Sequence, residues 1–371
     1  MNNSTSSRGT LRVSRRTFLA GAAAACAAPY VVPRSAFGAN DRIAVGAIGV
    51  GGRGRGHVNT FLRYGQTQVV AVCDPFEKKR EAAKAHTERH YSAQAGTGSY
   101  KGCAAYADFR ELVARDDIDA VVIASPEFWH ALHALGALKT GKDVYCEKAM
   151  TLTVAEGQAV RAAVRRHGRI FQIGTQQRSS RNFRFACELA CNGYLGKLHT
   201  VEVGVPGGHA PPNVPPSPVP PGLDYEMWLG PAPATPYNTL KCSYNWYFVY
   251  DYCIGWIGSW GVHHIDIAQW GAPSLCTKPL QIEGTATIPT DGLGNTSTAW
   301  RVTMATPDGI RLSFSHNRHH PQGCRFVGDK GWVHVHRGGI RAQPASLLKM
   351  AIKPHEEHLY VSSGHHTNFI E

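Results

Sequence analysis

Three glycines and one aspartate have the spacing of a dinucleotide-binding site. Gly49, Gly51 and Gly54 form a G-x-G-x-x-G pattern directly after an apolar run, and Asp74 ends the next apolar run, 20 positions after Gly54. In such a unit the first glycine permits a tight turn, the second lets the backbone approach a pyrophosphate, and the third allows close packing of helix on strand. A helix that begins at the motif presents free N–H groups to the phosphates. The sequence therefore predicts a dinucleotide site here.

The acidic residue also indicates which dinucleotide binds. Asp74 would accept hydrogen bonds from the adenosine ribose and would repel a 2′-phosphate, so the sequence favours NAD over NADP. Gly52 and Arg53 lie inside the motif and are expected to contact the cofactor as well. The alternative is a glycine-rich turn in an unrelated α/β protein, which does not account for strand, helix and acid in this order.

The elements around the motif alternate between strand and helix. Predicted strands are residues 43–48, 69–73, 120–124, 143–146 and 169–173, and predicted helices are 55–64, 77–90, 106–115, 128–140 and 154–166. This alternation predicts a Rossmann-type, doubly wound parallel sheet of the α/β class. In such sheets ligands bind beyond the C-terminal ends of the strands.

Polar residues follow two of these strands and are therefore candidates for the site. Ser125, Pro126 and His130 come after one strand, and Glu147 and Lys148 after the next. We expect all five to contribute to cofactor binding.

Three segments resemble the Gfo/Idh/MocA oxidoreductase family: the glycine motif, Ser-Pro-Glu-Phe-Trp-His at 125–130, and Tyr-Cys-Glu-Lys at 145–148. The resemblance implies an NAD(P)-dependent enzyme that acts on sugars or polyols, and the family includes some glycosidases. It also implies that Lys148 lies near the nicotinamide and the reacting hydroxyl. A lysine that is partly desolvated beside this cationic ring gives up its proton more readily, which would suit Lys148 for acid–base catalysis. Ala149 stands where the family usually has the proline that helps to fix this loop.

The second half contains further candidates. Gly-Thr-Gln-Gln-Arg at 174–178 resembles the segment by which secreted members of the family enter their second domain, which makes Gln176 a cofactor contact and Arg178 a substrate contact. Residues 206–222 are rich in proline and glycine and form a predicted surface loop near the site. His209 in this loop is a candidate substrate contact; ordinary loop polar residues are the alternative for all three.

A histidine-containing segment at 258–270 is a predicted helix that places His263 and Asp266 on one face. The resemblance assigns His263 to the family's catalytic histidine and Asp266 to the aspartate after it, which we expect to contact substrate. A histidine with a near-neutral pKa would suit hydroxyl deprotonation. Ser259 occupies the position of the family's first aspartate, so either lysine and histidine act alone or another group replaces that carboxylate. His263 and His264 point apart on a helix, and no metal site is expected.

The remainder of the chain predicts strands at 281–288, 297–304, 310–316 and 331–336. They indicate an α+β domain with an open, mostly antiparallel sheet, one face over a substrate cleft and the other pairing subunits of a homo-oligomer. The predicted domains are residues 40–170 for NAD binding and 171–371 for the substrate. Family members usually continue past this point, so a truncated C-terminus is expected.

Residues 1–39 resemble an export signal. Ser14 to Leu19 (SRRTFL) resembles the twin-arginine motif, and the apolar stretch that follows is too short for a membrane span in the mature protein. We expect the twin-arginine translocase to export the folded protein to the periplasm or beyond. The net charge of +12 includes five arginines of this segment, and the later charges are scattered, which argues against a nucleic-acid partner.

Three functions remain open on these grounds. The first is an exported NAD-dependent oxidoreductase that transfers hydride from a sugar or polyol carbon to nicotinamide. The second is a redox-assisted glycoside hydrolase or lyase whose tightly bound NAD is recycled. The third is a non-catalytic nucleotide- or sugar-binding protein, which Ala149, Ser259 and the short C-terminus would allow.

Overall fold

The computed structural model describes residues 42–96 and 99–371, which build two sheets with separate hydrophobic cores. The predicted export signal at residues 1–39 lies outside the described residues. Within the described ranges, no helix combines the length and the apolar character that a membrane crossing requires.

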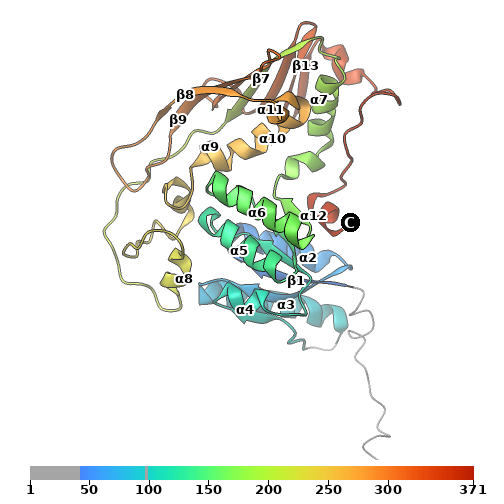
Figure 1. Ribbon diagram of the computed structural model, residues 1–371. Coiled ribbons are helices and arrows are strands. Elements are labelled where there is room, and N and C mark those ends of the chain that lie inside the picture. Colours follow the sequence, from blue (N-terminus) through green and yellow to red (C-terminus); the bar gives the residue numbers. More distant parts are fainter. Residues whose placement is uncertain (1–41, 97–98) are drawn as a thin grey trace, which may run out of the picture. The chain divides into compact units, whose positions relative to one another are not determined.

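The first sheet has six parallel strands in the order β3-β2-β1-β4-β5-β6 (Figure 1). They are β1 (Ile43–Ile48), β2 (Thr67–Cys73), β3 (Ala104–Tyr106), β4 (Ala120–Ile123), β5 (Asp143–Cys146) and β6 (Phe171–Ile173). Strands β2 and β3 follow on one side of β1, and β4, β5 and β6 follow on the other, so the strand order switches between β1 and β4. Ligands bind at such a switch point. The predicted doubly wound sheet is confirmed, with β6 just beyond the predicted domain boundary at residue 170.

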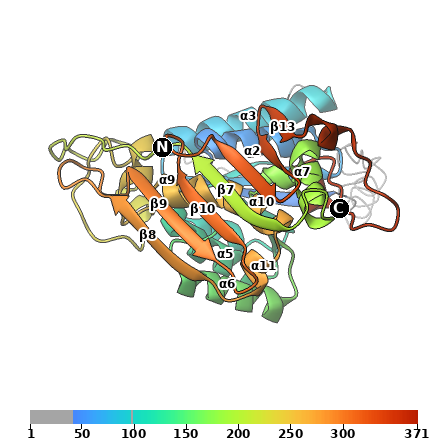
Figure 2. The same cartoon turned by 90° about the horizontal axis from the view of Figure 1, so that it is seen from above.

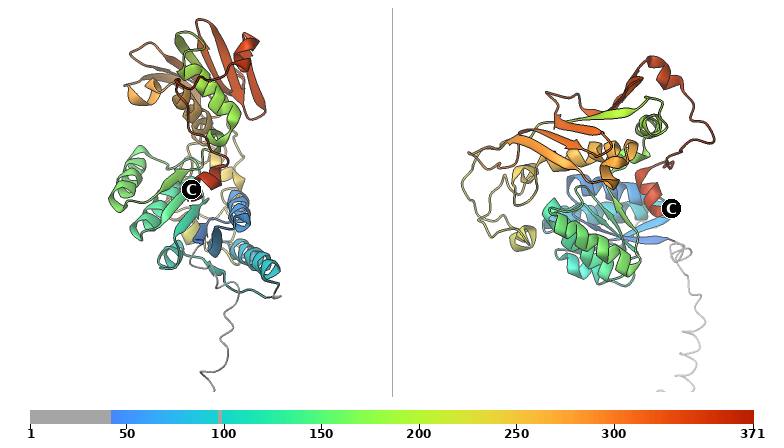
Figure 3. Two further views of the ribbon diagram at one scale, coloured as in Figure 1. Left: turned by 90° about the vertical axis from the view of Figure 1, so that its right-hand side faces the viewer. Right: turned by 45° about the horizontal axis from the view of Figure 1, so that its top comes forward.

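Helices cover both faces of this sheet (Figure 3). α2 (Gly52–Arg63) and α3 (Glu77–Ala95) pack on one face, and α4 (Phe109–Val113), α5 (Glu127–Lys139) and α6 (Val154–His167) pack on the other. The predicted helix over 106–115 is wrong at its start, because residues 104–106 pair with β2 as strand β3. The Asp108 side chain then accepts a hydrogen bond from Arg110 N–H and caps α4.

The second sheet has seven strands in the order β13-β12-β11-β7-β10-β9-β8, seen from its outer face in Figure 2. They are β7 (Leu198–Val205), β8 (Gln281–Thr287), β9 (Ala299–Ala305), β10 (Arg311–His316), β11 (Gly323–Gly328), β12 (Gly331–His336) and β13 (Gly339–Gln343). Only the β7–β10 pair is parallel among these strands, so the predicted mostly antiparallel sheet is confirmed. The sequence did not indicate β11 and β13.

Helices α7 (Arg181–Cys191) and α10 (Gly261–Gly271) cover the inner face of the second sheet and enclose its core. The short helix α9 (Trp256–Ser259) directly precedes α10. Shorter elements are η3 (Gln176–Ser179), α8 (Tyr225–Leu229), η4 (Tyr244–Phe248), α11 (Ser274–Thr277), η5 (Ala345–Lys349) and α12 (His365–Ile370). α12 returns to the first sheet, where Phe369 packs with the residues of α2 and α3.

One segment of the second half is hydrogen-bonded to the first half, and we call residues 222–230 the strap. Glu77 N–H donates to the Gly222 carbonyl at 2.7 Å, and Asp224 N–H donates to the Pro75 carbonyl at 3.1 Å. Trp129 Nε1 donates to the Trp228 carbonyl at 3.0 Å. The strap therefore closes over the segment that follows β2 and over the first turn of α5.

Candidate active site

A cavity of about 630 Å³ lies where the C-terminal ends of the first sheet's strands face α9 and α10. Ten of the predicted cofactor contacts line it: Gly49, Gly51, Gly52, Arg53, Asp74, Ser125, Pro126, Glu147, Lys148 and Gln176. The second half contributes aromatic and polar walls, among them Tyr247, Trp256, Ser259, Trp260, His263 and Arg337. The fold therefore brings the glycine motif, the lysine and the histidine into one space.

The glycines at one end of the cavity leave the backbone open to a ligand. Gly49 has a φ of +77°, and a Cβ there would clash with the backbone of Ser125, so the tight turn requires glycine. A Cβ at Gly51 would meet only the Lys79 side chain at 3.8 Å, and one at Gly52 would meet nothing. The N-cap residue of α2 is Gly51, which makes no side-chain cap, so among the described residues the first N–H groups of the helix are free for a phosphate. These residues fit the pyrophosphate of a dinucleotide.

Gly54 and Asp74 support this end of the site in two different ways. A Cβ on Gly54 would clash with the Gly49 carbonyl, so Gly54 serves close packing and does not line the cavity. Asp74 is buried and accepts hydrogen bonds from Val50 N–H and Phe76 N–H, each at 3.0 Å. Burial raises the pKa of Asp74, against the nearby charge of Lys79 and these two bonds. The carboxylate is thus oriented by the backbone at the adenosine end.

Glu147 links the phosphate end to the reaction end. Its Oε1 accepts from Arg53 Nε and pairs with His57 Nε2, both at 2.9 Å. Burial raises the pKa of Glu147, but the hydrogen bond and charge of His57 and the charge of Arg53 outweigh it and hold the pKa well below its ordinary value. Glu147 is therefore an ionised residue that positions Arg53 at the cavity wall.

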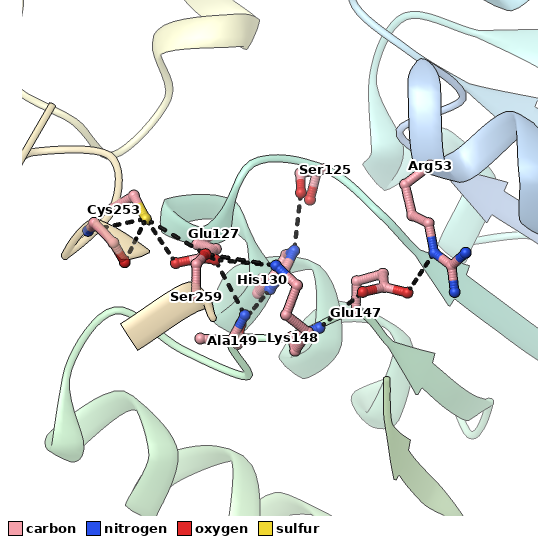
Figure 4. A network of polar contacts seen from close by, with 10 residues as sticks. Arg53, Ser125, Glu127, His130, Glu147, Lys148, Ala149, Cys253 and Ser259 are labelled. Atoms are coloured by element: carbon pink, nitrogen blue, oxygen red, sulfur yellow. Dashed lines mark hydrogen bonds and ion pairs between the residues drawn. The ribbon is translucent and has the colours of Figure 1, made fainter. Parts of the chain in front are cut away.

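Lys148 lies in a buried polar network with residues of three elements (Figure 4). Its Nζ is 3.8 Å from Glu127 Oε1 and 3.5 Å from Ser259 Oγ. Glu127 is 1% exposed and also accepts hydrogen bonds from the Ser259 hydroxyl and, at 3.0 Å, from the Cys253 thiol. Glu127 thus supplies a carboxylate beside Lys148 where Ser259 replaces the aspartate implied by the family resemblance.

Backbone hydrogen bonds hold the loop after Lys148 in the absence of a proline. Ala149 N–H, which a proline would lack, donates to Glu127 Oε1 at 3.2 Å. His130 joins this loop to the one after β4, with Nδ1 2.6 Å from the Ala149 carbonyl and Nε2 2.9 Å from the Ser125 carbonyl. His130 is buried and does not line the cavity, so it positions the two loops and makes no direct cofactor contact.

His263 lines the cavity on α10, but its protonation differs from the expectation. Burial, followed by the charges of Arg337 and Lys148, lowers the pKa of His263 to about 3, so the expected near-neutral pKa is wrong. The ring is 5% exposed and its Nδ1 has no hydrogen-bond partner among the described residues. His263 is therefore a neutral hydrogen-bonding group at the reaction end. His264 is fully buried behind it and pairs through Nδ1 with Gln177 Nε2 at 3.2 Å.

Three predicted substrate contacts do not reach the cavity. Arg178 and Asp266 form a bidentate ion pair, with Nε–Oδ2 and Nη2–Oδ1 both at 2.7 Å, because η3 and α10 pack side by side. This pair satisfies both side chains and braces the second domain. His209 is exposed and contacts the Phe248 ring edge-on, at 5.4 Å between ring centroids. The structure therefore corrects all three assignments.

Sequence reasoning missed several side chains that line the cavity or, like the buried Glu127, contact its lining residues. Glu127 follows β4 directly and begins α5, a position that could have singled it out. Arg337 lies in the β12–β13 turn, far from any motif. The aromatic wall gave no periodic signal in the sequence because its residues come from η4, α9 and the residue after α9. The ring centroids of Trp246 and Tyr247 in this wall are 3.8 Å apart, in a stacked arrangement.

Comparison with known families agrees with this geometry. Residues 43–175 match the model of the oxidoreductase family, NAD-binding Rossmann fold, and residues 208–356 match the family's C-terminal alpha/beta domain. The protein belongs to the Gfo/Idh/MocA family of oxidoreductases and has its NAD-binding Rossmann domain.

Curated relatives match over parts of the chain. A glycosyl hydrolase family 109 protein of Shewanella putrefaciens is 36% identical over 116 residues, which cover 31% of this chain and 24% of that protein. The uncharacterized oxidoreductase YrbE of Bacillus subtilis is 28% identical over 174 residues, 47% of each chain. The matched regions thus span between a quarter and a half of these relatives' lengths.

Solved structures share the fold at low sequence identity. The WlbA dehydrogenase of Bordetella pertussis, in complex with NADH and UDP-GlcNAcA, aligns with a TM-score of 0.59 at 18% identity over 79% of each chain. An NAD-binding protein of Listeria innocua aligns with a TM-score of 0.56 at 20% identity, covering 80% of this chain and 73% of that one.

Proposed function

We propose that this protein is an NAD-dependent oxidoreductase that oxidises a hydroxyl group of a sugar or polyol. The observation that carries the proposal is the position of Lys148 in the same cavity as the open glycine turn, with the buried Glu127 carboxylate 3.8 Å from its Nζ. Asp74 at the adenosine end favours NAD over NADP. When bound, the nicotinamide accepts the hydride that leaves the substrate carbon.

The chain's own residues handle the proton of this reaction. The neutral amine form of Lys148 takes the hydroxyl proton at Nζ as the C–H hydride departs, which leaves a carbonyl on the substrate and an ammonium beside Glu127. Glu127 and Ser259 hold Nζ in place, and neutral His263 orients the hydroxyl by hydrogen bonding. The aromatic wall of Tyr247, Trp256 and Trp260 offers faces on which a sugar ring can stack.

Two measurements test this proposal: whether the purified protein retains a nucleotide, and whether it then turns over a sugar or polyol. We expect mass analysis of the purified protein to find bound NAD, and a panel of sugars and polyols to yield NADH with at least one member. Lys148→Met should lower kcat by about 100- to 10,000-fold while NAD remains bound. Lys139→Met, an exposed change at the end of α5, serves as the control. Absence of bound nucleotide, together with no binding on titration, would contradict the proposal.

A second candidate is supported by the family 109 glycosyl hydrolase relatives. In that reaction the same site oxidises a sugar hydroxyl, and the acidified neighbouring C–H bond permits elimination of the glycosidic group. Water then adds to the resulting double bond, and the hydride returns to the carbonyl carbon. Glycoside cleavage without net NADH would favour this candidate over the first. A protein that retains NAD but catalyses neither reaction would instead be a nucleotide- or sugar-binding protein.

Export and assembly complete the proposal. The twin-arginine-like sequence at Arg15 and Arg16 supports export by the twin-arginine translocase to the periplasm or beyond. Fractionation of cells that express the Arg15→Lys, Arg16→Lys variant should show the protein retained in the cytoplasm. The strand-lined outer face of the second sheet (Figure 2) supports pairing of two subunits, which light scattering would measure.

A further inference from the structure

Arg337 is a cation at the reaction end of the cavity for which the described residues provide no carboxylate partner. It lies in the turn between β12 and β13 and lines the cavity together with His263 and Trp260. Its Nε donates to Gln177 Oε1 at 3.2 Å, and its guanidinium lies 4.6 Å from the centre of the Trp260 ring. These two contacts fix the guanidinium plane and leave both terminal nitrogens open.

The nearby acids are already paired with other cations. Glu147 accepts from Arg53 and His57, and Glu127 lies beside Lys148. Burial and then the charge of Arg53 lower the pKa of Arg337, and the charge of Glu147 opposes them only in part. Arg337 nevertheless stays ionised at neutral pH, because a guanidinium does not lose its proton there. The reaction end therefore holds an uncompensated positive charge.

A ligand that fills the cavity displaces the water that hydrates this charge. A guanidinium without water or a counter-ion is costly to bury, whereas a carboxylate restores charge-assisted hydrogen bonds. The two free terminal nitrogens of Arg337 form a planar fork that matches the two oxygens of a carboxylate. The cofactor's pyrophosphate has its own site at Gly51, Gly52 and the N-terminus of α2, so the anion at Arg337 must belong to another ligand.

We propose that Arg337 binds a carboxylate of the substrate, so that the oxidised sugar is an acidic one, a uronic or aldonic acid. The assignment rests on the proposed oxidoreductase function and narrows its substrate class. Lys148 faces the reacting hydroxyl and Arg337 anchors the acid group, while the ring between them stacks on Trp256 or Trp260. A neutral sugar would leave the guanidinium desolvated and unpaired.

Binding measurements on the NAD-loaded full chain test this assignment without relying on turnover. The ligands are acids paired with neutral counterparts: glucuronate with glucose, galacturonate with galactose, and gluconate with glucitol. Calorimetry should show at least one acid binding about 10- to 100-fold more tightly than its neutral partner. Arg337→Met should abolish that preference, and Arg337→Lys should keep part of it. Arg341→Met, an exposed change on β13, should leave it intact.

Kinetics with the same panel separate a substrate contact from a structural role. Arg337→Met should raise KM for the acid about 10- to 100-fold and change kcat little, with NAD content and melting temperature unaltered. A wild-type preference for the neutral sugars, equal binding by Arg337→Met, or loss of NAD from that variant would each overturn the assignment. If acid binding depends on Arg337 but no turnover occurs, the assignment of Arg337 is upheld and the oxidoreductase proposal is contradicted instead.

Discussion

The two ends of the cavity are built in different ways. At the phosphate end the ligand meets backbone: an open glycine turn, free N–H groups of α2, and Asp74 oriented by two backbone donors. At the reaction end the ligand meets side chains from distant segments, because Glu127, Lys148 and Ser259 converge only after both domains have folded. The first end therefore depends on local geometry, and the second on the hydrogen bond that joins Ser259 of α9 to Glu127 of α5.

The largest effect is expected where a side chain is added to a glycine that lines the phosphate end of the cavity. Gly51→Val should weaken NAD binding by at least about 100-fold, roughly 2.7 kcal/mol, because its side chain would occupy the space of the pyrophosphate. Gly56→Val in the same helix is the control, since a Cβ at Gly56 meets no atom. Fluorescence titration with NAD measures both. Equal losses in the two variants would show that the helix, and not the open turn, was damaged.

A carboxylate exchange tests the other end. Glu127→Gln should lower kcat about 10- to 100-fold with NAD affinity unchanged, because Lys148 loses its charged partner. Adding Ser259→Asp to that variant should recover a large part of the loss by returning a carboxylate to the same position.

The matched control for this exchange is Glu111→Gln, an exposed change in α4. Steady-state kinetics at fixed pH gives the comparison. If the double variant is no more active than Glu127→Gln alone, then the role of Glu127 is more than to provide a charge beside Lys148.

A smaller effect, on the pH dependence of stability, is expected at the buried His264 behind the reaction end. Burial, with Arg337 and two histidines adding to it, lowers the pKa of His264 to about 3. The unfolded chain therefore binds a proton near pH 6.5 that the folded chain refuses, so stability falls as pH drops from about 6.5 toward 3. The His264→Asn variant keeps an acceptor for Gln177. Its free energy of unfolding should fall by roughly 2 kcal/mol less than that of the wild type between pH 6.5 and 4.5.

Urea unfolding at the two pH values measures this difference. His199→Asn, an exposed change on β7, should follow the wild-type curve. An unchanged pH dependence in His264→Asn would mean that His264 binds its proton in the folded protein as readily as in the unfolded chain.

The smallest effect is expected at a residue that the sequence placed in the site and the structure does not. His209→Ala should change kcat/KM by less than about twofold, because the ring is exposed and contacts Phe248 outside the cavity. Kinetics with the best substrate of the panel provides the measurement. A tenfold loss would instead indicate that the loop at 206–222 reaches the bound substrate.

The sequence predicted that Gly49, Gly51 and Asp74 come together at one end of the cavity, because their spacing places them along one strand–helix–strand unit. It also predicted Lys148 correctly as a cavity residue. It failed for Arg178 and Asp266, since a polar pair on neighbouring elements can satisfy itself as easily as it can bind a ligand. Arg337 and the partnership of Glu127 with Ser259 depend on three-dimensional packing and leave no mark on local pattern.

The strap has a kinetic consequence for the cofactor. Its backbone bonds to Glu77 and Pro75, and the bond from Trp129 to Trp228, tie it to segments that flank the adenosine end. Release of a dinucleotide past Met227 and Trp228 requires these bonds to open together, so we expect a slow off-rate and a long residence time. An oxidoreductase of this kind would keep one molecule of NAD through many catalytic cycles, as enzymes keep a prosthetic group, and its turnover would then require a second substrate to reoxidise that molecule in place.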